Sequence, residues 1–169
     1  LGLPYEPARW RIDQGALVRV QGDADVQVTD AELAHSPHYA VFVEGIAGET
    51  SASVVTGNTV HHAGYGVVYS GDFSGGQQGE LTGNAFSDIA NGPVSLATPL
   101  PLLSNNVAVV GADGRAGCYE FSTGITTAET LRGDAGMPFC TSYLQIASGG
   151  ALTVEPGVVV KMGSGAYVQ

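Results

Sequence analysis

The sequence predicts an all-β protein built as a parallel β-helix, a coil of short strands in which each turn rests on the previous one. A unit that carries one asparagine and one downstream glycine recurs every 22 to 26 residues. Between the turn residues, apolar and polar side chains alternate as they do in strands. The spacing of the 25 glycines leaves no apolar pattern of helical period. Together these observations favour stacked coils of about 22 to 27 residues.

The clearest repeat begins as V-T-G-N-T-V at 55–60, and it returns as L-T-G-N-A-F at 81–86 and as L-S-N-N at 103–106. A divergent copy precedes it, because Y-A-V-F at 39–42 aligns with Y-G-V-V at 65–68. Coils that stack about 4.8 Å apart allow side-chain amides to bond from one coil to the next. The repeat therefore predicts an amide ladder at one turn, formed by Asn58, Asn84 and Asn106. A second corner that excludes a Cβ atom is predicted at Gly66, Gly92 and Gly114.

The same alignment predicts three inward columns of side chains. They are Val55, Leu81 and Leu103; Val60, Phe86 and Ala108; and Phe42, Val68, Val94 and Ala116. An antiparallel sandwich is the alternative, since asparagine and glycine also mark its turns. Two columns that match at the same offsets favour the coil. The skeleton of a leucine-rich repeat is absent, and a propeller blade runs to about 40 residues.

The predicted organisation has three parts. Coils with asparagine and glycine columns occupy 1–117, an irregular junction occupies 118–142, and a further coil occupies 143–169, completed by residues or a chain beyond its end. Short strands are expected at 9–12, 16–20 and 26–28, and the stretch 31–35 is compatible with a helical turn.

Cys118 and Cys140 flank the predicted junction and are 22 residues apart, which equals one coil. Neighbouring coils bring their Cα atoms into the range that a disulfide requires. In an oxidising compartment we expect the bond to form and to add roughly 3 kcal/mol by the chain-entropy model. The alternative is a pair of buried thiols. No further ligands have suitable spacing for a metal, and the sequence points to no cofactor.

A resemblance to a family rests on residues 150–166, G-A-L-T-V-E-P-G-V-V-V-K-M-G-S-G-A. This stretch resembles the G-x-L-T-I-E-P-G-V-x-V-K-F-G-x-G-A coil of bacterial secreted and cell-surface right-handed parallel β-helix repeat proteins. The T-G-N units at Thr56 and Thr82 are similar to N-x-F units of those proteins. The resemblance implies a right-handed parallel β-helix and an extracellular or cell-surface location, and it carries no catalytic residues. In that family the coil usually opens the β-helix, whereas here it comes last, which suggests an excised piece of a longer protein or an end completed by another chain.

Composition excludes several classes of partner. A formal net charge of −10 with only six Lys and Arg argues against a nucleic-acid surface and against an anionic membrane face. No apolar run approaches the roughly 20 residues that a membrane helix needs, so membrane insertion is not expected. A first residue other than Met suggests a processed or excised segment. One lysine, many Ser and Thr and two Cys are typical of an extracytoplasmic protein.

The best candidates for chemistry are four histidines and one carboxylate. His61 lies 26 residues after His35, and Asp88 lies 26 after His62, so these side chains are expected on one edge of the stack, with His38 nearby. A histidine beside a carboxylate can act as a base, and a pair of histidines can hold a metal. The alternative is a set of solvated residues that follow the asparagine turn. No converging acidic column of a lyase or a glycoside hydrolase is visible.

These observations predict a non-catalytic extracellular module with a structural, adhesive or assembly role. Unpaired strand edges at its ends invite end-to-end self-association or pairing with another chain. The alternative function is that of a carbohydrate-active enzyme, a polysaccharide lyase or glycoside hydrolase, or a carbohydrate-binding β-helix that uses the histidine–aspartate edge.

Overall fold

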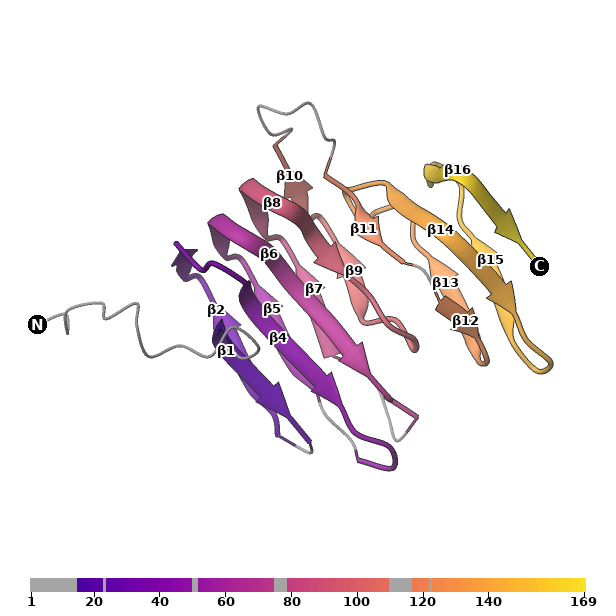
Figure 1. Cartoon of the computed structure of the whole chain (residues 1–169), viewed down its shortest axis with the longest axis horizontal. Helices are drawn as coiled ribbons and strands as arrows, with labels where there is room; N and C mark the ends of the chain where they lie inside the picture. Colours follow the sequence, from indigo (N-terminus) through magenta and orange to yellow (C-terminus); the bar gives the residue numbers. More distant parts are fainter. Residues whose placement is uncertain (1–14, 23, 50–51, 75–78, 110–116, 122) are drawn as a thin grey trace, which may run out of the picture.

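The computed structural model describes residues 15–22, 24–49, 52–74, 79–109, 117–121 and 123–169. Within them the chain forms a parallel β-solenoid of about six turns and contains no helix (Figure 1). The predicted fold class, all-β with stacked parallel strands, is confirmed. The strand expected at 9–12, together with Gly114 and Ala116, lies outside the described residues.

The strands of the described residues follow one another without intervening helices. Their bounds are β1 Ala16–Gln21, β2 Val26–Thr29, β3 Glu32–Ala34, β4 Tyr39–Gly45, β5 Ser53–Thr56, β6 Thr59–Gly71, β7 Gly79–Thr82, β8 Ala85–Ser95, β9 Leu102–Ser104, β10 Val107–Ala108, β11 Tyr119–Glu120, β12 Thr123–Ile125, β13 Ala128–Leu131, β14 Phe139–Ile146, β15 Ala151–Val154 and β16 Val160–Val168.

These strands make three parallel sheets. The largest runs in the order β1-β4-β6-β8-β11-β14-β12, with β3 on β6, β10 on β8 and β16 on β14. A second sheet has the order β2-β5-β7-β9, and β13 pairs with β15 in the third. Figure 1 shows the coils side by side along the long axis, from β1 at one end to β15 and β16 at the other. Each coil therefore contacts mainly the coils before and after it.

Two of the predicted inward columns are confirmed by the strand register. Val55 lies opposite Leu81, and Leu81 opposite Leu103. Val60 lies opposite Phe86, whose column ends at Ala108. Both columns are buried except for the half-buried Ala108, and complete burial of such aliphatic and aromatic side chains contributes about 1.5 to 3 kcal/mol each.

The third predicted column is wrong by one position. The register between β6 and β8 shifts between Ala63 and Tyr65, so Val94 lies opposite Val67 and not opposite Val68. The interior column runs through Val41, Val67 and Val94 and continues into Tyr119 and Phe139. A β-bulge adds one residue to one strand of a pair, and here it lengthens the spacing from 26 to 27 in mid-strand.

The same bulge separates the predicted glycine column. Gly92 lies opposite Tyr65, so Gly66 and Gly92 do not occupy equivalent positions. Both glycines lie inside strands, in β6 and β8, and not at a corner. A Cβ atom at Gly66 would lie 2.2 Å from the carbonyl oxygen of Pro93. Close backbone approach therefore explains the glycine at 66.

The stretch 118–142, expected as an irregular junction, continues the stack. Strand β11 pairs with both β8 and β14, β12 pairs with β14, and β13 pairs with β15. The helical turn considered for 31–35 is also absent, because β3 occupies Glu32–Ala34. There Leu33 enters the interior beneath Val60 while its two neighbours face outward, which is the alternation of a strand.

Candidate functional site

The predicted histidine group lies at one corner of three successive coils. His35, His62 and Asp88 each have a left-handed backbone, with φ of 59°, 52° and 50°. Ala34, which precedes His35, lies opposite His61, and His61 lies opposite Ser87, the residue before Asp88. The column at this corner is therefore His35, His62 and Asp88, and His61 belongs to the neighbouring position.

His61 is hydrogen-bonded on both ring nitrogens. Its Nε2 lies 2.7 Å from Oε1 of Glu32, and its Nδ1 lies 2.7 Å from Nδ1 of His62. When Glu32 is ionised and both rings are neutral, His61 donates from Nε2 and accepts at Nδ1 from the Nδ1–H of His62. Nε2 of His62 is then free to accept a proton and lies 3.9 Å from Oδ2 of Asp88. The hydrogen-bonded chain therefore runs from Glu32 through His61 to His62, and Asp88 lies beyond hydrogen-bonding distance at its end.

His35 joins this group from the preceding coil. Its ring stacks on His62 with centroids 5.0 Å apart and planes inclined by 25°. Ring contacts join His35, His61 and His62 to one another, whereas the ring of His38 contacts that of Tyr39. Glu32 is the member that sequence reasoning missed. Because side chains alternate along β3, Glu32 lies on the same face as Ala34. Ala34 is the register partner of His61, so Glu32 lies next to the position that His61 faces.

The chemical capacity of this corner is that of a solvated acid–base group. The side chains of His62 and Asp88 are more than half exposed, whereas that of His61 is 19% exposed. Among the described residues, no group of three or more His, Cys, Asp or Glu is arranged to hold a metal ion.

A second group, the asparagine ladder, is fully buried. Asn58 donates from its backbone nitrogen and from Nδ2 to Oδ1 of Asn84, at 3.0 and 2.9 Å. Asn84 repeats both bonds to Oδ1 of Asn106, again at 3.0 and 2.9 Å. Each Nδ2 also donates to a carbonyl of the preceding coil: Val28, Val55 or Leu81. These side chains satisfy backbone groups that the turn would otherwise leave unpaired.

The ladder is closed at both ends by other residues. The backbone nitrogen of Ala31 donates to Oδ1 of Asn58 at 3.0 Å. At the other end, Nδ2 of Asn106 donates to the hydroxyl of Tyr119, which donates to the carbonyl of Ala135. Burial raises the pKa of Tyr119 well above its ordinary value, so the phenol stays protonated and keeps this bond. Tyr119 carries no repeat signal, and its role appears only in three dimensions.

Glu129 is a buried carboxylate that the sequence did not single out. It faces inward beside the buried Leu131, accepts from Oγ1 of Thr127 at 2.7 Å and accepts from the nitrogen of Leu100 at 3.0 Å. A carboxylate with these partners anchors the connection before β9 to the coil of β13. Its role is structural.

The disulfide between Cys118 and Cys140 is confirmed, with Cα atoms 5.8 Å apart. It crosses from the residue before β11 to β14 on the adjacent coil. A disulfide of this kind is typical of proteins from an oxidising environment.

The C-terminal end of the stack differs from its interior. We call β15, β16 and the corner between them, residues 151–168, the C-terminal end face. Four inward columns have their last members there, and these residues are substantially exposed. They are Val154, Val160, Met162 and Val168, which are 50%, 38%, 48% and 56% exposed. Their partners one coil earlier are almost fully buried: Leu131, Phe139, Thr141 and Leu144.

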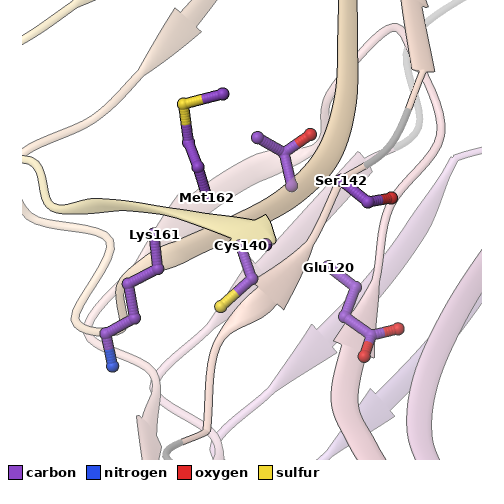
Figure 2. A pocket seen from close by; sticks show the side chains of 7 residues that line it. Glu120, Cys140, Ser142, Lys161 and Met162 are labelled. Atoms are coloured by element: carbon purple, nitrogen blue, oxygen red, sulfur yellow. The ribbon is translucent and has the colours of Figure 1, made fainter. Parts of the chain in front are cut away.

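Two hollows adjoin the C-terminal end face. One, of about 410 Å³, is lined by Glu120, Cys140 and Lys161 among others. Figure 2 shows Lys161 and Met162 pointing to opposite sides of β16 at this hollow. The second, of about 370 Å³, lies between the corner at Met137 and Pro138 and the last corner, with Lys161 again in its lining.

No helix in the described part of the chain has the length and apolar character to cross a membrane. Comparison with protein-family models, with curated proteins and with solved structures finds no match to this chain.

Proposed function

We propose that this protein is a non-catalytic structural module of the extracellular space or cell surface, with a role in adhesion or assembly. Its solenoid would be extended at the C-terminal end face by a further β-coil. The observation that carries this proposal is the exposure of the four column ends, Val154, Val160, Met162 and Val168, in a stack whose other columns are buried.

The backbone of the same end supports the proposal. Among the described residues, β15 pairs only with β13 and β16 only with β14. Their outer edges therefore present N–H and C=O groups that can accept another strand. Pairing at this edge also removes apolar surface from water, at about 25 cal/mol per Å². Both effects favour an added coil over an exposed end.

The disulfide and the composition support an extracellular setting. Oxidising compartments preserve a bond such as Cys118–Cys140. A chain with −10 formal charge and one lysine also avoids nucleic acids and anionic lipid faces. The fold explains the regular spacing of the buried asparagines, because their side-chain amides hydrogen-bond from one turn to the next.

Sedimentation velocity over a range of protein concentrations tests the proposal. We expect wild-type protein to associate and the double variant Val160→Lys/Met162→Lys to remain monomeric, because lysines would have to be buried at the end face. Leu17→Lys is the matched control, since Leu17 is also 50% exposed but lies on β1 at the opposite end. A strictly monomeric wild-type protein at every concentration would contradict the assembly role.

A carbohydrate-active role is the second candidate, and one observation favours it. The 2.7 Å contact with Glu32 orients His61, which in turn is hydrogen-bonded to Nδ1 of His62, so Nε2 of His62 is the nitrogen placed to act as a general base. Wild type and the variant His61→Ala/His62→Ala should be screened together for cleavage of polysaccharides. Activity that is lost in the variant would support an enzyme. Equal activity in both proteins would remove this corner as the site.

A further inference from the structure

We propose that the contact between His61 and His62 is a pH-sensitive switch. At neutral pH the two rings share one hydrogen bond. In acid the rings separate, and each pairs with a carboxylate of its own, His61 with Glu32 and His62 with Asp88. The inference goes beyond the proposed function and does not depend on it.

The hydrogen bond between the two rings has room for a single hydrogen atom. Nδ1 of His61 lies 2.7 Å from Nδ1 of His62, so one nitrogen must donate and the other must accept. Nε2 of His61 lies 2.7 Å from Oε1 of Glu32 and donates to this carboxylate. Nε2 of His62 is therefore the ring nitrogen that can take up a proton without disturbing the contact. The closed pair accepts one proton.

A second proton breaks the contact. It must bind the accepting Nδ1, which sets two N–H donors and two positive charges against each other at 2.7 Å. The ring of His35 adds to this effect, because it stacks on His62 with centroids 5.0 Å apart. When both of these rings are charged, they repel each other. Acid therefore drives His62 away from both neighbouring histidines.

The carboxylates of the corner are placed to receive the separated rings. Glu32 already accepts from His61, and Oδ2 of Asp88 lies 3.9 Å from Nε2 of His62. His62 and Asp88 occupy equivalent positions of adjacent coils, and both have a left-handed backbone, with φ of 52° and 50°. Rotation of the exposed His62 side chain can thus close the remaining gap while the backbone stays in place.

The charge of the corner changes sign as the switch opens. Its titratable groups come from three successive coils, and they are Glu32 from β3, His35 from the turn after it, His61 and His62 from β6, and Asp88 from β8. Strand β10, which pairs with β8, adds the uncharged Val107 and Ala108. With neutral histidines the two carboxylates give a formal charge of −2, and three charged histidines make it +1.

Nuclear magnetic resonance of protein labelled with nitrogen-15 in its histidines tests the switch, because a hydrogen bond between two nitrogens carries a scalar coupling. Histidine side chains are ordinarily charged below about pH 6.5. We therefore expect coupling between Nδ1 of His61 and Nδ1 of His62 at about pH 8 and its loss by about pH 4.5, in a protein whose amide spectrum stays that of the folded state. Three results would each overturn the proposal: no coupling at the higher pH, coupling that persists at the lower pH, or loss of coupling only when the whole chain unfolds.

Asp88→Asn separates the switch from a general effect of charge. Asparagine has nearly the same shape and suits the left-handed backbone, but it offers no charge to His62. We expect the coupling of this variant to persist to a pH lower by about half a unit. Asp30→Asn is the matched control, since Asp30 also has a φ of 50° but lies at a different corner, beside Gly57. It should leave the transition unmoved at physiological salt. Equal shifts in both variants, or none in either, would overturn the pairing of His62 with Asp88.

Discussion

Nδ2 of Asn106 donates a hydrogen bond of 2.9 Å to the hydroxyl of Tyr119, and this hydroxyl donates in turn to the carbonyl oxygen of Ala135 at 2.6 Å. The asparagine ladder ends at this contact. In the next coil the backbone of Ala135 faces Asn106 without an amide side chain to continue the pattern. A tyrosine from the interior column supplies the missing partner, and it links the regular coils to the disulfide-bonded region after them.

Tyr119→Phe should lower the free energy of unfolding by about 1 to 3 kcal/mol, because it leaves a buried amide hydrogen and a buried carbonyl without this partner. Urea denaturation followed by circular dichroism measures the change. Tyr167→Phe is the control, since its side chain is 54% exposed and should change stability by less than about 0.5 kcal/mol. Equal effects of the two substitutions would argue against the closing role of Tyr119.

Asn84→Ala should be more costly than Tyr119→Phe. The middle amide accepts from Asn58 twice, and it donates to Asn106 and to the carbonyl of Val55. Its loss leaves several buried groups unpaired, each worth about 1 to 3 kcal/mol. We expect a loss of at least about 3 kcal/mol or a failure to fold, measured by urea denaturation and by the yield of soluble protein. The exposed Asn91→Ala is the control and should be close to neutral.

Gly66→Ala tests the close approach of β6 to β8. The added Cβ would lie 2.2 Å from the carbonyl oxygen of Pro93, and relief requires the backbone of one strand to shift. We expect a clear fall in the melting temperature. Gly124→Ala is the matched control, because a Cβ there meets nothing within 4 Å. If both variants melt at the wild-type temperature, the strands at Gly66 are further apart than described.

Stability at alkaline pH should fall as tyrosines ionise in the unfolded chain. Burial raises the pKa of Tyr69 to about 12 from its ordinary value of 10.0. Between these values the unfolded state loses the proton and the folded state keeps it, so the free energy of unfolding decreases as pH rises from about 10 to 12. Each such group contributes a slope of up to about 1.4 kcal/mol per pH unit. Tyr69→Phe should reduce this slope, measured by urea denaturation at several pH values, and should leave the pH dependence below about pH 9 as it is in wild type.

Loss of the disulfide should destabilise the region after the ladder. A bond that closes a loop of 22 residues is worth about 3 kcal/mol in the chain-entropy model. The double variant Cys118→Ser/Cys140→Ser should therefore unfold at lower urea, and wild type should approach it after reduction. An unchanged midpoint on reduction would show that the bond adds nothing to stability.

The spacing of the repeated asparagines and apolar residues was enough to predict the architecture. The Asn columns at 58, 84 and 106 mark equivalent positions because a turn that stacks on itself repeats the same hydrogen bonds in every coil. Apolar residues at fixed offsets placed the columns of Val55 and Val60 correctly, since inward and outward positions alternate in a strand.

Only the tertiary structure decided the features that depend on contacts between coils. The bulge between Ala63 and Tyr65 shifts the register partners of Gly92 and Val94 by one position. A single extra residue cannot be recognised in a sequence repeat whose spacing already varies. Glu32 joined His61, and Tyr119 closed the ladder, because neighbours across coils are set by register and not by a motif. The open C-terminal end face was visible only as exposure of Val154, Val160, Met162 and Val168, since the same apolar residues look like ordinary core in the sequence.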